Sequence, residues 1–337
     1  MHRGAGRGDH GDSVISSGSH DDDVVGSRAS RSPSSIGRRT RDLMTLRASI
    51  SRPRTGSERI VPAMSVTTAH IALATGARIP QVGLGVYLSP HGKATRDAVA
   101  AALEIGYRHV DTARIYGNEA DVGAAVRASG VPRDQVFVTT KLWNDDHGYD
   151  KALRALDASL DRLGLEYVDL YLIHWPVQGK RRESWRALER AFHDGRARAI
   201  GVSNYLVPHL RELLDEAKVV PHVNQIELSP FLQRRDTCAL CREHSVAVEA
   251  YSPLTRARRL DHPAIVAAAR AAGRTPAQVL LRWGIQHGFV ILPKSVRRER
   301  IAENAAVFDF TLDGAAMARL DELEEGLTTG WDPEGAP

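Results

Sequence analysis

The chain has 337 residues, with 45 Lys and Arg residues against 41 Asp and Glu residues, which gives a formal net charge of +4. Its 42% hydrophobic and 26% charged residues are typical of a globular protein that buries a large core unaided. The two cysteines exclude a disulfide framework and favour a reducing compartment, the cytoplasm. No run of 18 apolar residues occurs, so the sequence predicts no membrane-spanning helix.

Residues 1–63 differ in composition from the rest of the chain. They contain eleven Arg, no Lys, seven acidic residues and no aromatic residue, so the whole net charge falls in this segment. Such a segment cannot bury enough apolar surface to offset its ordering entropy, and we predict a disordered, low-complexity extension. A start codon assigned too far upstream would also explain it, with Met64 as the first residue. The second predicted domain, 64–337, is electrically neutral, which argues against a nucleic-acid or membrane partner.

From residue 64 onward, short β-branched runs alternate with helical stretches. The first two runs, HIALA and RIPQV, flank Thr75-Gly76 and predict a short N-terminal β-hairpin. Eight later runs predict strands at 82–86, 108–111, 136–141, 168–174, 199–203, 222–227, 247–251 and 290–293.

Between these strands, apolar residues recur three and four positions apart, the spacing of a helix with one buried face. Strands that alternate with helices indicate a parallel sheet with crossover helices. About eight such units favour a closed (β/α)8 TIM barrel, an α/β fold, over an open sheet. The predicted helices are 95–105, 151–163, 184–193, 207–217, 297–307 and 313–323, together with 262–287, which splits into two near Gly273 and Pro276.

Polar residues follow the predicted strands where each strand ends. In a barrel of parallel strands, this end is where catalytic side chains are placed. One such residue could be a hydrogen-bonded core group, but polar residues at seven strand ends favour an active site. These residues are Asp111, Lys141, His174, Ser203, Asn204, Gln225, Tyr251 and Lys294.

The segments around these residues resemble the aldo-keto reductase family. The resemblance rests on GYRHVDTARIYGNEADVG (106–123), TTKLW (139–143), LIHWP (172–176), ARAIGVSNY (197–205) and LPKSVRRERIAEN (292–304). It spans 66–330 in the family's order, and the short C-terminal tail resembles the bacterial 2,5-diketo-D-gluconate reductases. The resemblance implies an NADPH-dependent oxidoreductase that reduces aldehydes and ketones to alcohols. One candidate reaction is the reduction of 2,5-diketo-D-gluconate to 2-keto-L-gulonate.

Carbonyl reduction needs a hydride donor at the carbon and a proton donor at the oxygen. Tyr116 is the candidate general acid, and the Lys141 ammonium is expected to lower its pKa from about 10 toward the working pH. Asp111 is expected to orient Lys141, while His174 is expected to hydrogen-bond the carbonyl oxygen. The resemblance implies the same four catalytic residues.

The cofactor is predicted from both the residues and the resemblance. No G-x-G-x-x-G sequence opens a helix, which excludes a Rossmann site. Lys294, Ser295 and Arg300 lie near a predicted helix N-terminus, which suits the 2′-phosphate of NADPH rather than NADH. The resemblance implies contacts to the nicotinamide from Ser203, Asn204, Gln225 and Tyr251, to the pyrophosphate from Ser252 and Leu254, to the adenine from Glu303 and Asn304, and further cofactor contacts from Gly85, Val86, Tyr87 and Val296.

A small-molecule carbonyl is the expected substrate, bound by a monomer. Tyr87, Trp143, His174 and Trp175 are expected to line its entrance, and a loop near 326–333 is expected to cover it. Two alternatives remain open at this point: a broad-specificity aldehyde or methylglyoxal reductase, and a non-catalytic NADPH-sensing protein on the same barrel.

Cys238 and Cys241 have the spacing of a redox or zinc motif. Only His244 lies close in sequence, which is too few ligands for structural zinc, so we predict no metal. We interpret the two cysteines as small residues on one helix face. His109 and His222 lie in predicted strands and are interpreted as core residues.

Overall fold

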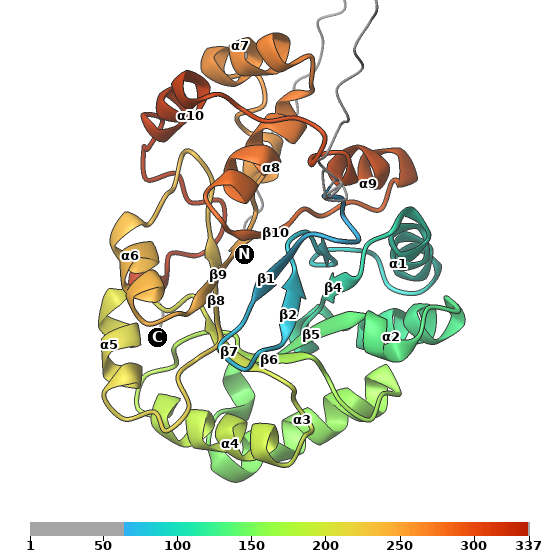
Figure 1. Ribbon diagram of the computed structural model, residues 1–337. Helices are drawn as coiled ribbons and strands as arrows, with labels where there is room; N and C mark the ends of the chain where they lie inside the picture. The colour runs from blue at the N-terminus through green and yellow to red at the C-terminus, as the bar shows by residue number, and fades with distance from the viewer. Residues whose placement is uncertain (1–63, 336–337) are drawn as a thin grey trace, which may run out of the picture. The chain divides into compact units, whose positions relative to one another are not determined.

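Eight parallel strands form a barrel in the computed structural model, which describes residues 64–335 (Figure 1). The predicted extension 1–63 lies outside the described residues. Each strand pairs with the next one in the chain, and the first and last are joined by bridges between Val82 and Ile291 and between Gly85 and Lys294. The strands are β3 (Leu84–Gly85), β4 (His109–Asp111), β5 (Phe137–Leu142), β6 (Leu170–Ile173), β7 (Ile200–Ser203), β8 (Val223–Glu227), β9 (Ala247–Tyr251) and β10 (Val290–Leu292).

The N-terminal hairpin, β1 (His70–Ala72) with β2 (Arg78–Pro80), is antiparallel as predicted. Its buried residues Leu73 and Ile79 pack in one apolar cluster with Leu170, Val223 and Val290, which lie at the starts of three barrel strands. The hairpin therefore closes the end of the barrel opposite the strand C-termini, so that access to the barrel interior is from the C-terminal end.

Helices alternate with the strands and surround the barrel (Figure 1). A second, larger apolar cluster fills the layer between strands and helices. The predicted helices are confirmed to within a few residues at their ends, including the split of 262–287 into two. The helices are α1 (Lys93–Ile105), α2 (Glu119–Ala128), α3 (Tyr149–Leu163), α4 (Arg181–His193), α5 (Val207–Leu214), α6 (Arg235–Glu243), α7 (Pro263–Ala272), α8 (Pro276–Gln286), α9 (Arg298–Ala305) and α10 (Gly314–Asp321).

Helix α2 was absent from the predicted ranges. Its central residue is Gly123, and glycine inside a helix lowers the intrinsic helix propensity. The reason for the glycine is long-range: a β-carbon at this position would overlap the backbone carbonyl of Leu163, where α2 packs against the end of α3. Between residues 64 and 335, no helix combines the length and the apolar character that crossing a membrane requires.

Candidate active site

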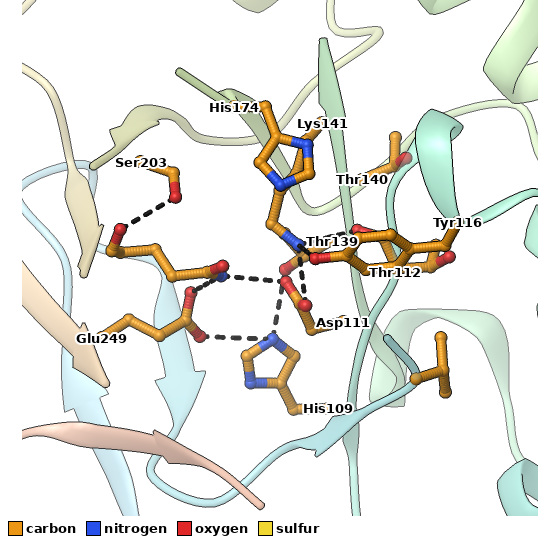
Figure 2. A network of polar contacts seen from close by, with 12 residues as sticks. His109, Asp111, Thr112, Tyr116, Thr139, Thr140, Lys141, His174, Ser203 and Glu249 are labelled. Carbon is orange, nitrogen blue, oxygen red and sulfur yellow. Dashed lines mark hydrogen bonds and ion pairs between the residues drawn. The ribbon is translucent and has the colours of Figure 1, made fainter. Parts of the chain in front are cut away.

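The four predicted catalytic side chains meet at the C-terminal ends of neighbouring strands (Figure 2). Asp111 ends β4, Lys141 lies in β5, and His174 directly follows β6. Tyr116 ends η1 (Arg114–Tyr116), a single helical turn in the loop after β4. Lys141 Nζ lies 2.7 Å from Asp111 Oδ1 and 3.3 Å from Tyr116 Oη. The Tyr116 and His174 ring centroids are 5.7 Å apart, so the four groups form one site.

The turn that holds Tyr116 is fixed by the backbone and by a buried asparagine. Gly117 has a φ of 68°, in the left-handed region that favours glycine, and this ends the turn directly after Tyr116. Asn118 Nδ2 donates to the Val86 carbonyl at 3.0 Å, and Asn118 Oδ1 accepts from Thr112 Oγ1 at 2.7 Å. Sequence reasoning missed Thr112 and Asn118, because only the folded loop shows which groups their side chains bridge.

Lys141 is completely buried and uses all three ammonium hydrogens inside the site. It donates to Asp111 Oδ1, to the Thr112 carbonyl at 2.9 Å and to Tyr116 Oη. Because the Tyr116 oxygen accepts this bond, the hydrogen of its own hydroxyl is free to point at another acceptor. The arrangement therefore suits proton donation to an oxygen placed beside Tyr116.

The proton affinity of Tyr116 differs from the sequence-based expectation. Burial raises the pKa of Tyr116 well above its ordinary value, and the nearby Asp111, Tyr87 and Glu249 raise it further. The expectation of a lowered pKa is wrong for the protein alone, because burial, followed by the charge of Asp111, which is paired with Lys141 at 2.7 Å, raises it instead. Tyr116 is therefore neutral, and the neutral phenol is the form that can donate a proton.

His174 is also held in its neutral form. Burial, followed by the charge of Lys141, holds the pKa of His174 well below its ordinary value. Asn204 Nδ2 donates to the His174 carbonyl at 3.0 Å and so fixes the backbone there. A neutral imidazole donates one N–H, which fits a role in orienting a carbonyl oxygen while Tyr116 supplies the proton.

Two further buried histidines predict how stability depends on pH. Burial lowers the pKa of His109 to about 3 and that of His147 to about 4. The unfolded chain binds these protons near pH ~6.5, so stability is lost as the pH falls below that value. We expect each histidine to cost about 2 kcal/mol at pH ~5. Urea unfolding at a slightly alkaline pH and at pH ~5 measures the loss of stability. His147→Gln should lose about 2 kcal/mol less than wild type over this pH range, and equal losses in the two proteins would contradict the prediction.

The predicted nicotinamide-binding residues form one hydrogen-bonded group at the ends of β7, β8 and β9. Ser203 Oγ donates to the Gln225 carbonyl at 2.9 Å, and Tyr251 Oη donates to Asn204 Oδ1 at 2.8 Å. Asn204 Nδ2 lies 3.1 Å from Ser203 Oγ. The aromatic ring of Tyr251 beside these hydroxyl and amide groups fits a flat ring that bears a carboxamide, as in nicotinamide.

The segment after β9, where we predict pyrophosphate contacts, has an unusual backbone. Eight non-glycine residues of the described chain have a positive φ, and half of them lie in this short segment. Such conformations cost about 1–3 kcal/mol each and occur mostly at functional loops. The predicted contacts Ser252 and Leu254 therefore lie in a strained loop. Its positive-φ residues are Ser252, Thr255, Arg256 and Ala257.

The residues predicted to bind the 2′-phosphate and adenine lie at β10 and α9. Lys294 follows β10, and its Nζ donates to the Leu88 carbonyl at 3.3 Å. Ser295 Oγ accepts from the Arg297 backbone N–H at 3.1 Å, just before α9. In the same region, Arg300 is exposed, Val296 is 39% exposed, Asn304 is buried, and Glu303 accepts from Thr275 Oγ1 at 2.6 Å.

Aromatic rings surround the catalytic group. Gly85 and Val86 are buried at the end of β3, and the next residue, Tyr87, is 47% exposed with its ring 5.0 Å from that of Tyr116. The rings of Trp143 and His174 are 5.3 Å apart. Trp175 is buried and lies 5.8 Å from Trp331, a residue of the predicted covering loop that is 70% exposed. The Thr329 backbone N–H donates to Glu227 Oε1 at 2.8 Å and anchors that loop to the end of β8.

The cysteine pair lies inside α6, as interpreted from the sequence. Both thiols are free and buried, and burial raises the pKa of Cys238 to about 12 and that of Cys241 to about 11. Thiols with such a high pKa are poor nucleophiles. Over residues 64–335, no three His, Cys, Asp or Glu side chains are grouped in a way that could hold a metal ion.

Comparisons with known proteins agree with this geometry. A model described as the aldo/keto reductase family matches residues 89–325. The glyoxal reductase of Bacillus subtilis is 44% identical over 264 residues, which cover 78% of this chain and 96% of that protein. The morphine 6-dehydrogenase of Pseudomonas putida is 49% identical over 278 residues, covering 78% and 94%. The crystal structure of an aldo-keto reductase complexed with NADPH superposes with a TM-score of 0.75 at 35% identity, covering 80% of this chain and 91% of that one.

Proposed function

Because the chain belongs to the aldo/keto reductase family and is an NADPH-dependent oxidoreductase, we propose that it reduces small aldehydes and ketones to alcohols with Tyr116 as the proton donor. The observation that carries the proposal is the hydrogen bond from the buried Lys141 ammonium to the Tyr116 oxygen, at 3.3 Å. It leaves the hydroxyl proton of Tyr116 available to a substrate oxygen.

In this proposal, NADPH supplies the hydride when it is bound. With that hydride delivered to the carbonyl carbon, Tyr116 would transfer its hydroxyl proton to the carbonyl oxygen as negative charge develops there, which gives the alcohol. The phenol oxygen becomes negative, and its hydrogen bond from Lys141 becomes stronger. An interaction that strengthens as the reaction proceeds lowers the barrier. His174 orients the carbonyl oxygen, and the Asp111 carboxylate orients Lys141.

Two substrate classes are proposed. Small aldehydes and 1,2-dicarbonyls such as methylglyoxal are supported by the similarity to a glyoxal reductase and by the aromatic residues Tyr87, Trp143 and Trp331 around the site. The second class is 2,5-diketo-D-gluconate, reduced to 2-keto-L-gulonate, a diketone whose reduction needs the same proton donor. All four catalytic groups come from one chain, which supports a monomer as the active unit. We also propose a cytoplasmic location.

Consumption of NADPH, followed at 340 nm, tests the proposal. The panel contains methylglyoxal, glyoxal, a simple aldehyde, a simple ketone and 2,5-diketo-D-gluconate. We expect turnover with at least the small dicarbonyls, and the ratio of kcat/KM values identifies the preferred class. Tight NADPH binding without turnover of any compound would contradict the proposed reduction and favour a sensor of the cofactor.

The proposed 2′-phosphate site predicts how Arg300 affects cofactor choice. A charge-assisted hydrogen bond to phosphate contributes about 1.5–3 kcal/mol, so Arg300→Ala should weaken NADPH binding about 10- to 100-fold. NADH has no 2′-phosphate, so its affinity should change little. Fluorescence titration of both cofactors measures the difference. Arg298→Ala is the matched control. Arg298 lies on the same helix as Arg300, but its side chain is paired with Glu104 of α1 at 2.6 Å. Equal losses for NADPH and NADH would contradict the assignment.

A further inference from the structure

Glu249 is a buried carboxylate that the proposed reduction does not use. It lies in β9 two residues before Tyr251, so both side chains point to the same side of the strand, toward the barrel interior. Its relative exposure is 0%. Figure 2 shows Glu249 and His109 on one side of Asp111, while Lys141 and Tyr116 lie on the other side.

Gln225 connects this carboxylate to the catalytic group. Its Nε2 donates to Glu249 Oε2 at 2.7 Å and to Asp111 Oδ2 at 2.9 Å. The primary amide has two hydrogens, and each binds one carboxylate. Asp111 and Glu249 are therefore held close together by a single amide, with the Lys141 ammonium on the far side of Asp111.

No positively charged partner is left to balance a negative charge on Glu249 among the described residues of this cluster. His109 Nε2 lies 3.6 Å from Glu249 Oε1, but it also contacts Thr139 Oγ1 at 3.1 Å, and its low pKa keeps it neutral. Lys141 is the ammonium of this group and already pairs with Asp111. This cluster thus includes the carboxyl groups of Asp111 and Glu249 and one ammonium, together with the neutral His109 and Tyr116 (Figure 2).

We propose that Glu249 is a positioning residue for the reduction. Gln225 holds Glu249 beside Asp111, and the charge of Glu249 sets the pH range in which Tyr116 retains its transferable proton. This inference rests on the proposed role of Tyr116. A negative charge at Glu249 opposes the formation of a phenolate at Tyr116 and so keeps the phenol protonated to higher pH. Burial and the neighbouring Asp111 raise the pKa of Glu249 itself well above its ordinary value, so its charge appears only as the pH rises.

The pH profile of kcat/KM for NADPH-dependent reduction tests the inference. The wild-type enzyme should lose activity at high pH, where Tyr116 ionises. Glu249→Gln keeps the shape of the side chain and removes its charge, so Tyr116 should ionise more readily. We expect the high-pH loss to move down by about one pH unit, the scale of a single nearby charge in a protein interior. Glu249→Met, which removes both the charge and the hydrogen bond, should shift the profile in the same direction.

Two controls separate this effect from a loss of structure. Glu249→Asp keeps the charge and should keep the high-pH limb near its wild-type position. Glu189→Gln removes a buried carboxylate on α4 that accepts from the backbone N–H groups of Lys218 and Val219, and it should leave the profile unchanged. An unshifted profile in either neutral variant overturns the inference. The proposed function fails in a different way: in that case Tyr116→Phe would retain full turnover.

Discussion

Tyr116→Phe is expected to reduce kcat for aldehyde reduction about 100- to 10,000-fold, the usual contribution of a general acid. The hydroxyl is the only part of the side chain that this change removes. The ring, which packs 5.0 Å from Tyr87 and 5.7 Å from His174, stays in place. We therefore expect the KM for the aldehyde and the Kd for NADPH to remain within a few-fold of the wild-type values, measured by steady-state kinetics and by fluorescence titration.

Tyr171→Phe provides the matched control for this variant. Tyr171 is a buried residue of β6, and its hydroxyl has no hydrogen-bond partner within residues 64–335. Removing it deletes the same atom from the same barrel without touching the proposed proton donor, so kcat should stay close to wild type. Equal kcat losses in the two variants would mean that Tyr116 acts through packing. Full turnover by Tyr116→Phe would assign the proton to another group.

The positions of the catalytic residues could be predicted because they follow from one local rule applied eight times. Each strand could be recognised from its own β-branched residues, and the residue at its C-terminal end could then be placed on a shared rim. Asp111, Lys141 and His174 were found in this way. Tyr116 needed the family resemblance as well, because it lies in a loop five residues beyond its strand.

The electrostatic state of the site could not be predicted in the same way. The pKa of Tyr116 depends on every charge that faces it, including that of Glu249, which is distant in sequence. Glu249 had one signal in the sequence: a carboxylate two residues before Tyr251 in a strand whose neighbouring residues are apolar. A buried acidic residue of this kind requires a partner, but the sequence could not show that Gln225 connects it to Asp111.

The buried ion pair between Lys141 and Asp111 explains why a single substitution in it should be costly for stability as well as for activity. Lys141 is fully buried and the Asp111 side chain is 5% exposed, so neither charge can recover its hydration if the other is removed. Gln225 Nε2 would still donate to Asp111 after Lys141 is lost, but a neutral amide cannot balance the carboxylate charge.

We expect Lys141→Met to lower the free energy of unfolding by about 3–5 kcal/mol, and Asp111→Asn to cause a loss of similar size, because each leaves one buried charge unpaired. The double variant removes both charges, so its stability should recover to within about 2 kcal/mol of wild type. Its kcat should stay as low as in Lys141→Met, since no ammonium remains to stabilise the Tyr116 phenolate. Urea unfolding and NADPH oxidation measured on all four proteins form the cycle. Additive losses of stability would show that the two charges do not depend on each other, and recovered turnover in the double variant would remove Lys141 from the proposed mechanism.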